Sequence, residues 1–452
     1  MKHWSERLRQ PSRFLAALAL TVLWPAIVQP ADSPATPAQP AAQMTLVKDT
    51  KVLTLDEAVQ TALENHPNIK AAQERVGAQQ AVLGQQKAAY YPTITNSNVY
   101  RSSTQTGTTG SSATGFDFFS SQINFNLTLY NFGKREGAVQ AARETLDATG
   151  YNYKTTVDSV ILGVKQTYFT YLGLAALVKV REETVKSREL LVRQAQGFYE
   201  VGTRAKIDVV RAESNLYNAQ ADLITAQNAV KVAWVTLKNA LGLRELPERP
   251  LAEEAIITTI PYTLDEAREI AFTSRPELKS FESQRKAQDQ NIATARRGHL
   301  PDLIFDANYG RRNTSNTGDN TFPLNATWQV QLSLNIPIFD GFRTTNRVEE
   351  NLRNYYVIRD QEEQQRQQVA LDVEQSYLRL VELQERIKAN EAAAKAAKEN
   401  LELANGRYQV GVGSIIEVTD AQTLYTDAQT TYIRALYEYK IADAQLVRAI
   451  GR

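Results

Sequence analysis

The chain has 452 residues, which is enough for two or three ordinary domains, and its formal net charge is +1. This balance gives no indication of a nucleic-acid partner, and we expect none. The lack of cysteine excludes disulfides, thiolate metal sites, catalytic thiols and a lipid-modified cysteine.

The start of the chain resembles an export signal. A basic segment precedes an apolar stretch at 14–28, which Pro25 interrupts, and small residues follow. This stretch is short for a membrane helix, which needs about 20 residues. We therefore expect a signal peptide at 1–31, followed by a linker at 32–53 that begins rich in proline and alanine.

The second half of the chain repeats the first at a constant offset of 209 residues. Thr54-Leu55-Asp56-Glu57-Ala58 returns as Thr263-Leu264-Asp265-Glu266-Ala267. We expect one repeat at 54–242, an inter-repeat segment at 243–262 and a second repeat at 263–452. Other equivalent positions are Pro67 and Pro276, Pro92 and Pro301, Tyr199 and Tyr408, Gly202 and Gly411, and Gly242 and Gly451.

Each repeat begins with a helix signal. A threonine followed three residues later by glutamate predicts a capping box, as at Thr54 and Glu57. Proline then interrupts the helix and, about 25 residues further on, ends it.

Two stretches with strand character follow in each repeat. Apolar and polar residues alternate most clearly in the second stretch, as in Gln122-Ile123-Asn124-Phe125-Asn126-Leu127. A run of about 9–11 such residues matches a tilted membrane strand. The expected strands lie at about 93–102, 118–131, 302–311 and 326–339.

Strands of this kind also occur in half-exposed sheets of soluble proteins. If they span a membrane, four strands are too few to close a barrel, since single-chain barrels begin at about 8 strands. Unpaired backbone groups are not tolerated in lipid, so the protein would have to oligomerise. Three chains would supply twelve strands.

Long helical hairpins complete the repeats. The segments 134–242 and 343–451 lack proline and are rich in good helix formers. A tight turn interrupts each at Val201-Gly202-Thr203 and Val410-Gly411-Val412. Their apolar positions are sparse and rich in alanine, which indicates lateral packing through narrow coiled-coil-like seams.

These parts in this order resemble the TolC family of outer-membrane channel proteins, over about residues 54–452. The strand-to-helix junctions Leu129-Tyr130-Asn131-Phe132-Gly133 and Ile336-Pro337-Ile338-Phe339-Asp340-Gly341 carry the resemblance, with the two hairpin turns. It implies a mainly α protein with a membrane β-barrel portion. A homotrimer would share one 12-stranded β-barrel in the outer membrane and extend a helical barrel into the periplasm.

The resemblance also implies a function and partners. The protein would be the exit duct of a tripartite efflux pump or a type I secretion system. Its partners would be a periplasmic adaptor, an inner-membrane pump of the RND, ABC or MFS class, and outer-membrane lipid. A periplasmic coiled-coil structural or adaptor protein without membrane passage is the alternative. It explains the helices but not the alternating strands.

Candidate site residues follow from the same resemblance. The family carries acidic residues beyond the second turn that ring the periplasmic aperture, and these match Glu417 and Asp420, three positions apart on one helix side. Asp208 and Tyr408 match two members of a network that ties the closed state. The family's arginine partner falls at Gly413, and Arg204 takes the equivalent place in the first repeat.

The turns themselves match the family's adaptor-contacting tips, with Val201, Gly202, Thr203, Val410, Gly411 and Val412 as the contacting residues. No pair of histidines has metal-ligand spacing, and no catalytic motif is evident. We expect neither enzymatic activity nor a cofactor.

Cell fractionation separates the two functional readings. We expect the protein in the outer-membrane fraction, extracted by detergent as a trimer, because its strands need lipid and additional chains. Recovery of the protein in the soluble periplasm would contradict the channel hypothesis.

Overall fold

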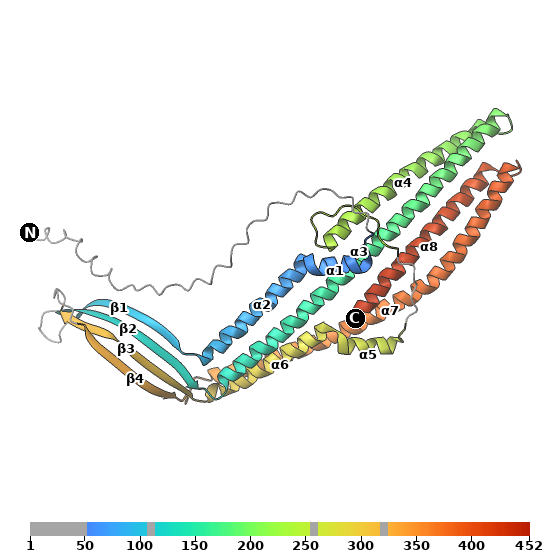
Figure 1. Ribbon diagram of the computed structural model, residues 1–452. Coiled ribbons are helices and arrows are strands. Elements are labelled where there is room, and N and C mark those ends of the chain that lie inside the picture. Colours follow the sequence, from blue (N-terminus) through green and yellow to red (C-terminus); the bar gives the residue numbers. More distant parts are fainter. Residues whose placement is uncertain (1–51, 106–113, 254–260, 317–323) are drawn as a thin grey trace, which may run out of the picture. The chain divides into compact units, whose positions relative to one another are not determined.

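The computed structural model describes residues 52–105, 114–253, 261–316 and 324–452 (Figure 1). The expected signal peptide and nearly all of the expected linker lie outside these residues. The α-helices of the second half follow those of the first by 209 positions, with unchanged lengths. They are α1 Leu55–Asn65 and α5 Leu264–Ser274, α2 Pro67–Lys87 and α6 Pro276–Arg296, α3 Lys134–Glu200 and α7 Arg343–Gln409, and α4 Lys206–Ala240 and α8 Ile415–Ala449.

Local signals set where the short helices begin. Glu266 and Thr263 form a reciprocal capping box: the Glu266 amide donates to Thr263 Oγ1 at 3.4 Å, and the Thr263 amide donates to Glu266 Oε2 at 2.8 Å. In the first repeat the Glu57 amide donates to Thr54 Oγ1 at 3.2 Å. Proline takes the first position of the following helix, as at Pro67, where its missing N–H removes no hydrogen bond. The short 3-10 turns η1 (Ala88–Tyr90) and η2 (Arg297–His299) lead from α2 and α6 to the strands.

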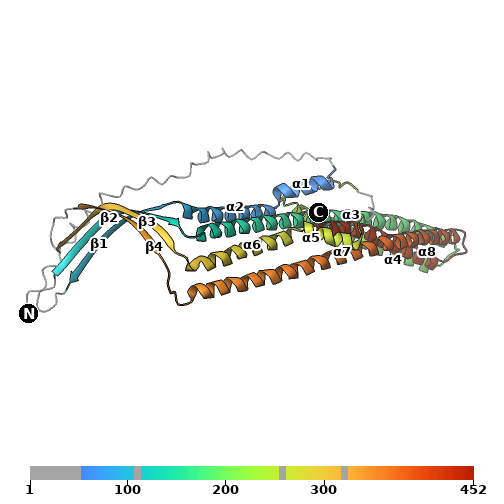
Figure 2. The ribbon, with the colours of Figure 1, turned by 90° about the horizontal axis from the view of Figure 1, so that it is seen from below.

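The described strands form one antiparallel sheet in the order β1-β2-β3-β4 (Figure 1). Figure 2 shows this sheet beyond the ends of α2 and α6. Within the described part of the chain, β1 and β4 each have one edge without a partner strand. The strands are β1 Thr93–Gln105, β2 Thr114–Tyr130, β3 Asp302–Asn316 and β4 Asn325–Asn335.

The strand ends differ from the expected ones. β1 and β3 continue past 102 and 311 to Gln105 and Asn316, and β2 begins at Thr114 rather than near 118. Backbone pairing does not require apolar side chains, so the ladders extend beyond the alternating pattern. β4 ends at Asn335 rather than 339, because Pro337 has no N–H to donate and restrains the backbone of Ile336.

The sheet has one apolar and one polar face. Ile123 pairs with Tyr309, and Tyr309 pairs with Trp328, so their side chains form a row across three strands. Trp328 is 75% exposed and Tyr309 62%. On the opposite face, Asn126 Nδ2 donates to Asp306 Oδ1 at 2.6 Å. An uncovered apolar face opposite a hydrogen-bonded polar face is typical of membrane strands that line a polar interior.

The helices pack laterally around apolar clusters. In the first repeat, Val164 of α3 packs with Ala58 of α1 and Leu237 of α4. The same offset reproduces this cluster in the second repeat with Val373, Ala267 and Leu446. Among the described helices, α3 alone is long and apolar enough to pass for a membrane span by composition, and its apolar residues supply much of the first cluster.

The described part of the inter-repeat segment is tied to the first repeat. Leu53 and Leu251 form a parallel bridge, with the Leu53 amide donating to the Pro250 carbonyl at 2.9 Å. The buried Tyr168 hydroxyl contacts the carbonyl oxygens of Leu53 and Ala252, each at 2.9 Å. This tyrosine therefore holds the segments on both sides of the first repeat against α3.

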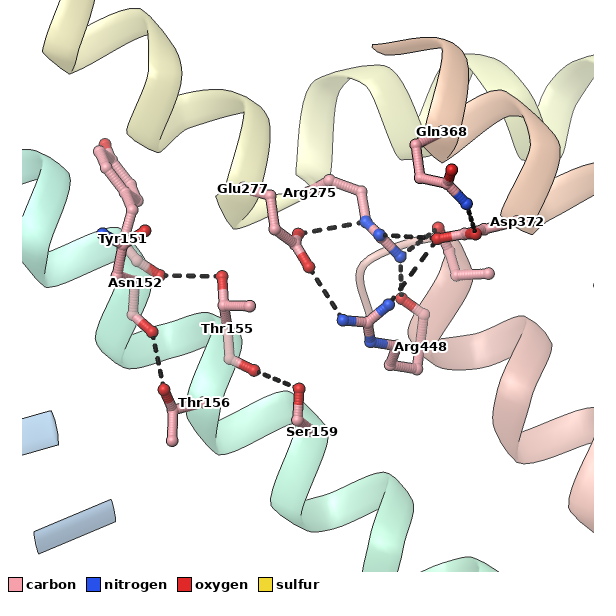
Figure 3. A network of polar contacts seen from close by, with 11 residues as sticks. Tyr151, Asn152, Thr155, Thr156, Ser159, Arg275, Glu277, Gln368, Asp372 and Arg448 are labelled. Carbon is pink, nitrogen blue, oxygen red and sulfur yellow. Dashed lines mark hydrogen bonds and ion pairs between the residues drawn. The ribbon is translucent and has the colours of Figure 1, made fainter. Parts of the chain in front are cut away.

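A buried ion cluster stabilises the second repeat (Figure 3). Arg275, at the junction of α5 and α6, is 2% exposed. Its Nε lies 3.1 Å from Glu277 Oε2, and its Nη2 lies 3.2 Å from Asp372 Oδ2 on α7. Arg448 of α8 approaches the same two carboxylates at 3.0 and 4.0 Å. The cluster thus joins three helices with two charges of each sign.

The cluster shifts the pKa of its members and of a neighbour. Burial lowers the pKa of Arg275, while the nearby Glu277 opposes that effect. On α3, burial and the charge of Glu277 raise the pKa of Asp158.

The first repeat has no equivalent of this cluster. The residues at the equivalent positions of the first repeat are His66, Asn68, Gly163 and Asn239.

We expect Arg275→Met to lower the free energy of unfolding by about 3 kcal/mol, because it removes one partner of two largely buried carboxylates. Thermal or urea unfolding in detergent, followed by circular dichroism, measures the change. The matched control is Arg268→Met, which removes an exposed pair with Asp265 at 3.7 Å and should cost less than about 1 kcal/mol. Equal losses in the two variants would contradict a special role for the buried cluster.

Candidate functional site

The two hairpin turns share one backbone geometry. After α3, the Thr203 amide donates to the Phe198 carbonyl and the Gly202 amide to the Tyr199 carbonyl, both at 2.9 Å. This pair of bonds is a Schellman motif, which requires a left-handed residue, and Gly202 has φ +79°. After α7, Gly411 has φ +84° in the equivalent place. Glycine is therefore required in both turns by geometry alone.

The turns present apolar side chains to solvent. Val201 is 71% exposed and Val410 is 74% exposed. Gly202, Thr203, Gly411 and Val412 are also exposed. All six residues expected at the adaptor-contacting tips therefore lie on an accessible surface.

Arg204 connects the first turn to the second. Its Nη2 donates to the carbonyl oxygen of Gly411 at 3.0 Å and to that of Gly413 at 2.6 Å. Its guanidinium carbon lies 5.6 Å from the ring centroid of Tyr408, within reach of a cation–π contact. Arg204 thus contacts the segment where the resemblance places an arginine.

Gly413 has no room for a side chain. A Cβ atom there would lie 2.9 Å from the Tyr408 amide nitrogen and 3.0 Å from the Arg407 carbonyl carbon. Both contacts are with backbone, so an arginine at 413 would require the turn to change shape. The close packing explains why the guanidinium comes from the first turn in this chain.

Tyr408 lies at the centre of this contact. It is fully buried, and its ring meets that of Phe198 edge to face at 5.5 Å between centroids. Burial and the charge of Asp208 raise the pKa of Tyr408, while Arg204 lowers it. The hydroxyl makes no hydrogen bond to any described residue. Tyr408 is therefore held by packing against Phe198 and Arg204, and the hydrogen bonds between the two turns come from Arg204.

Glu417 and Asp420 lie on the exposed side of α8. Ser414 caps this helix, its Oγ accepting from the Glu417 amide at 3.2 Å. The Glu417 carboxylate lies 3.4 Å from Arg407 Nε. Asp420 is exposed one turn later, while Val418 between them is buried. The two acids share one face of α8 but are not part of the contact around Tyr408.

Two arginines near these acids were not predicted as site residues. Arg407 pairs with Glu417, and Arg188 of α3 is buried against the start of α8. A comparison of the repeats could have identified both, because the equivalent positions are Phe198 and Ala397. A charge in one repeat opposite an apolar residue in the other marks a place where the copies differ in function or packing.

A cavity of about 890 Å³ lies at the starts of α3 and α7. Lys134 and Asp302 line it and form an ion pair at 3.0 Å. Within the described ranges, no three potential metal-ligating side chains come together.

Comparison with known proteins identifies a family whose model matches both repeats. The model of the family described as outer membrane efflux protein matches residues 58–243 and 268–452, one match per repeat. Outer membrane protein TolC of Vibrio cholerae is 26% identical over 345 residues, covering 74% of this chain and 77% of that protein. The probable efflux pump outer membrane protein TtgC of Pseudomonas putida is 24% identical over 405 residues, covering 88% and 82%.

The fold has a solved counterpart. The outer membrane protein VceC of Vibrio cholerae superposes with a TM-score of 0.74 at 20% identity, over 88% of this chain and 96% of that one. This likeness shows a shared fold.

We expect Arg204→Leu to increase hydrogen exchange of the second-turn amides about tenfold, because two charge-assisted hydrogen bonds are lost. Exchange measured by mass spectrometry on peptides covering 408–416 tests this. Arg211→Leu is the matched control, since Arg211 is exposed on the same hairpin, seven positions further along. If both variants left exchange at the second turn unchanged, the bonds from Arg204 would not hold it.

Proposed function

The chain belongs to the outer membrane efflux protein family, and on that premise we propose that Glu417 and Asp420, at the start of α8, gate an outer-membrane exit duct. Proteins of this family are channels of the outer membrane that extend into the periplasm, and they are not enzymes. They are trimers that work with an adaptor and an inner-membrane pump. The chain is thus a transport component, and membrane passage excludes the purely periplasmic alternative.

The sheet accounts for the membrane part of this function. Its uncovered apolar face suits lipid, and its polar face suits a water-filled interior. β1 and β4 each offer an unpaired edge, which lipid does not tolerate. Three copies join these edges into one closed barrel of twelve strands.

The observation that carries the gate proposal is the shared exposed face of Glu417 and Asp420. Both acids lie in the first turns of α8, directly beyond a hairpin turn. In a trimer they supply six carboxylates around one axis. A ring of carboxylates attracts cations and repels anions, so it gives an aperture charge selectivity.

Two further features support the closed state and adaptor docking. Arg204 ties the two turns of one protomer, which holds the ends of both hairpins together. The exposed valines at the tips offer apolar contacts to an adaptor. We propose that the adaptor binds these tips and that its binding loosens the contact made by Arg204. The pump, whether of the RND, ABC or MFS class, selects the exported substrate together with the adaptor, and the duct does not.

Planar bilayer recordings test the gate. We expect the double variant Glu417→Gln, Asp420→Asn to reduce the cation-to-anion permeability ratio about threefold or more, because the aperture loses its fixed negative charge. The isosteric control Glu64→Gln removes an exposed carboxylate on α1 and should leave the ratio unchanged. A wild-type ratio in the double variant would show that these acids do not line the aperture.

A further inference from the structure

Part of the buried contact between α3 and α8 is polar. Thr184 Oγ1 lies 3.2 Å from Thr426 Oγ1, and both side chains are less than 9% exposed. Ser187 Oγ donates to Gln422 Oε1 at 2.7 Å. This seam joins the first helical hairpin to the second, so its chemistry governs how the two are held together.

Arg188 is the charged member of this seam. It is 7% exposed, and its Nη2 donates across the seam to the Thr419 carbonyl at 3.4 Å and to Thr423 Oγ1 at 3.2 Å. Its Nη1 is buried and makes no hydrogen bond to any described residue. Two neutral acceptors therefore leave the guanidinium charge without a paired anion in direct contact.

The candidate for that anion is Asp420, whose charge acts on Arg188. It directly follows Thr419, whose carbonyl accepts from Arg188. The charge of Asp420 raises the pKa of Arg188, but burial lowers it more. A small polar cavity of about 70 Å³, lined by Arg188, Ser187 and Gln422, also adjoins the guanidinium and has room for water.

The repeat shows that hairpin packing does not require an arginine here. The position equivalent to Arg188 is Ala397 on α7. The positions equivalent to Thr419 and Thr423 are Val210 and Ser214 on α4. The second repeat thus lacks the charge and the hydrogen bonds, and its long helix is nevertheless the same length.

We propose that Arg188 is a positioning residue of the gate, which holds the start of α8 against α3 and acts as the fixed counter-charge of Asp420. This inference rests on the proposed role of Asp420 at the aperture. In a trimer, three buried guanidinium groups would offset part of the charge of six carboxylates. Arg188 thereby limits the cation selectivity of the aperture, and it also fixes the position of the acidic start of α8.

Reversal potentials in planar bilayers, measured under a salt gradient, test this charge role. We expect Arg188→Met to raise the cation-to-anion permeability ratio about threefold, since the aperture then loses three positive charges. Arg188→Lys should keep a nearly wild-type ratio, because it retains the charge. In the double variant Arg188→Met, Asp420→Asn the ratio should return close to that of the wild type.

The matched control is Arg181→Met. Arg181 lies two turns before Arg188 on α3, but its Nη1 faces Asp222 of α4 at 3.8 Å rather than α8. Its loss should leave the permeability ratio unchanged. Arg188→Gln provides a second neutral variant that can still hydrogen-bond to the threonines, and trimer assembly is checked for each variant by native electrophoresis.

The outcomes are distinct. A wild-type protein that conducts no ions would contradict the proposed function itself. A conducting wild type with an unchanged ratio in Arg188→Met would overturn only the role of Arg188, as would a double variant whose ratio stays as high as that of Arg188→Met alone. Failure of both neutral variants to assemble would identify Arg188 as a folding residue and would also overturn the proposal.

Discussion

The constraint on which the structure depends is the need to pair every backbone amide and carbonyl that lies in lipid. The described sheet leaves one edge of β1 and one edge of β4 unpaired, and its apolar face is exposed from Ile123 across to Trp328. A single chain cannot satisfy these groups, so assembly is a condition of membrane residence. The duplication supplies two hairpins and four strands per chain, so a trimer presents six near-equivalent helical units below one closed sheet.

That near-equivalence makes the differences between the repeats informative. Helix lengths are the same in both copies, whereas buried arginines are not. Arg275 lies at the junction of α5 and α6, and Arg188 lies in the seam between the hairpins. The equivalent positions in the other copy are His66 and Ala397, which carry no guanidinium. Burial of a guanidinium is costly unless its partners are well placed. Each therefore marks a position where the packing of the two copies differs, while both copies share equivalent apolar clusters.

Sequence patterns predicted the parts of the fold that depend on local chemistry. The capping threonines, the prolines at helix starts and the turn glycines act within a few residues, so the helices and turns could be derived. The strand ends could not, because the ladders of β1 and β3 continue through polar residues by backbone pairing alone. Comparison of the repeats marks the positions of Arg188 and Arg407, but their contacts could not be derived, since each contact joins different helices. The repeat offset places Arg204 opposite Gly413, but only the packing around Gly413 shows that a side chain does not fit there.

The constant offset between the copies has a mechanical consequence. Arg204 contacts the carbonyls of Gly411 and Gly413 at the ends of two helices that each extend 67 residues, or about 100 Å. Deleting one residue from either helix would shorten it by about 1.5 Å and rotate its tip by about 100°. Such a change would remove this contact even though no contacting residue had been altered. The two hairpins therefore have to match in length, and we expect insertions and deletions to be tolerated only in segments that do not set the level of the turns.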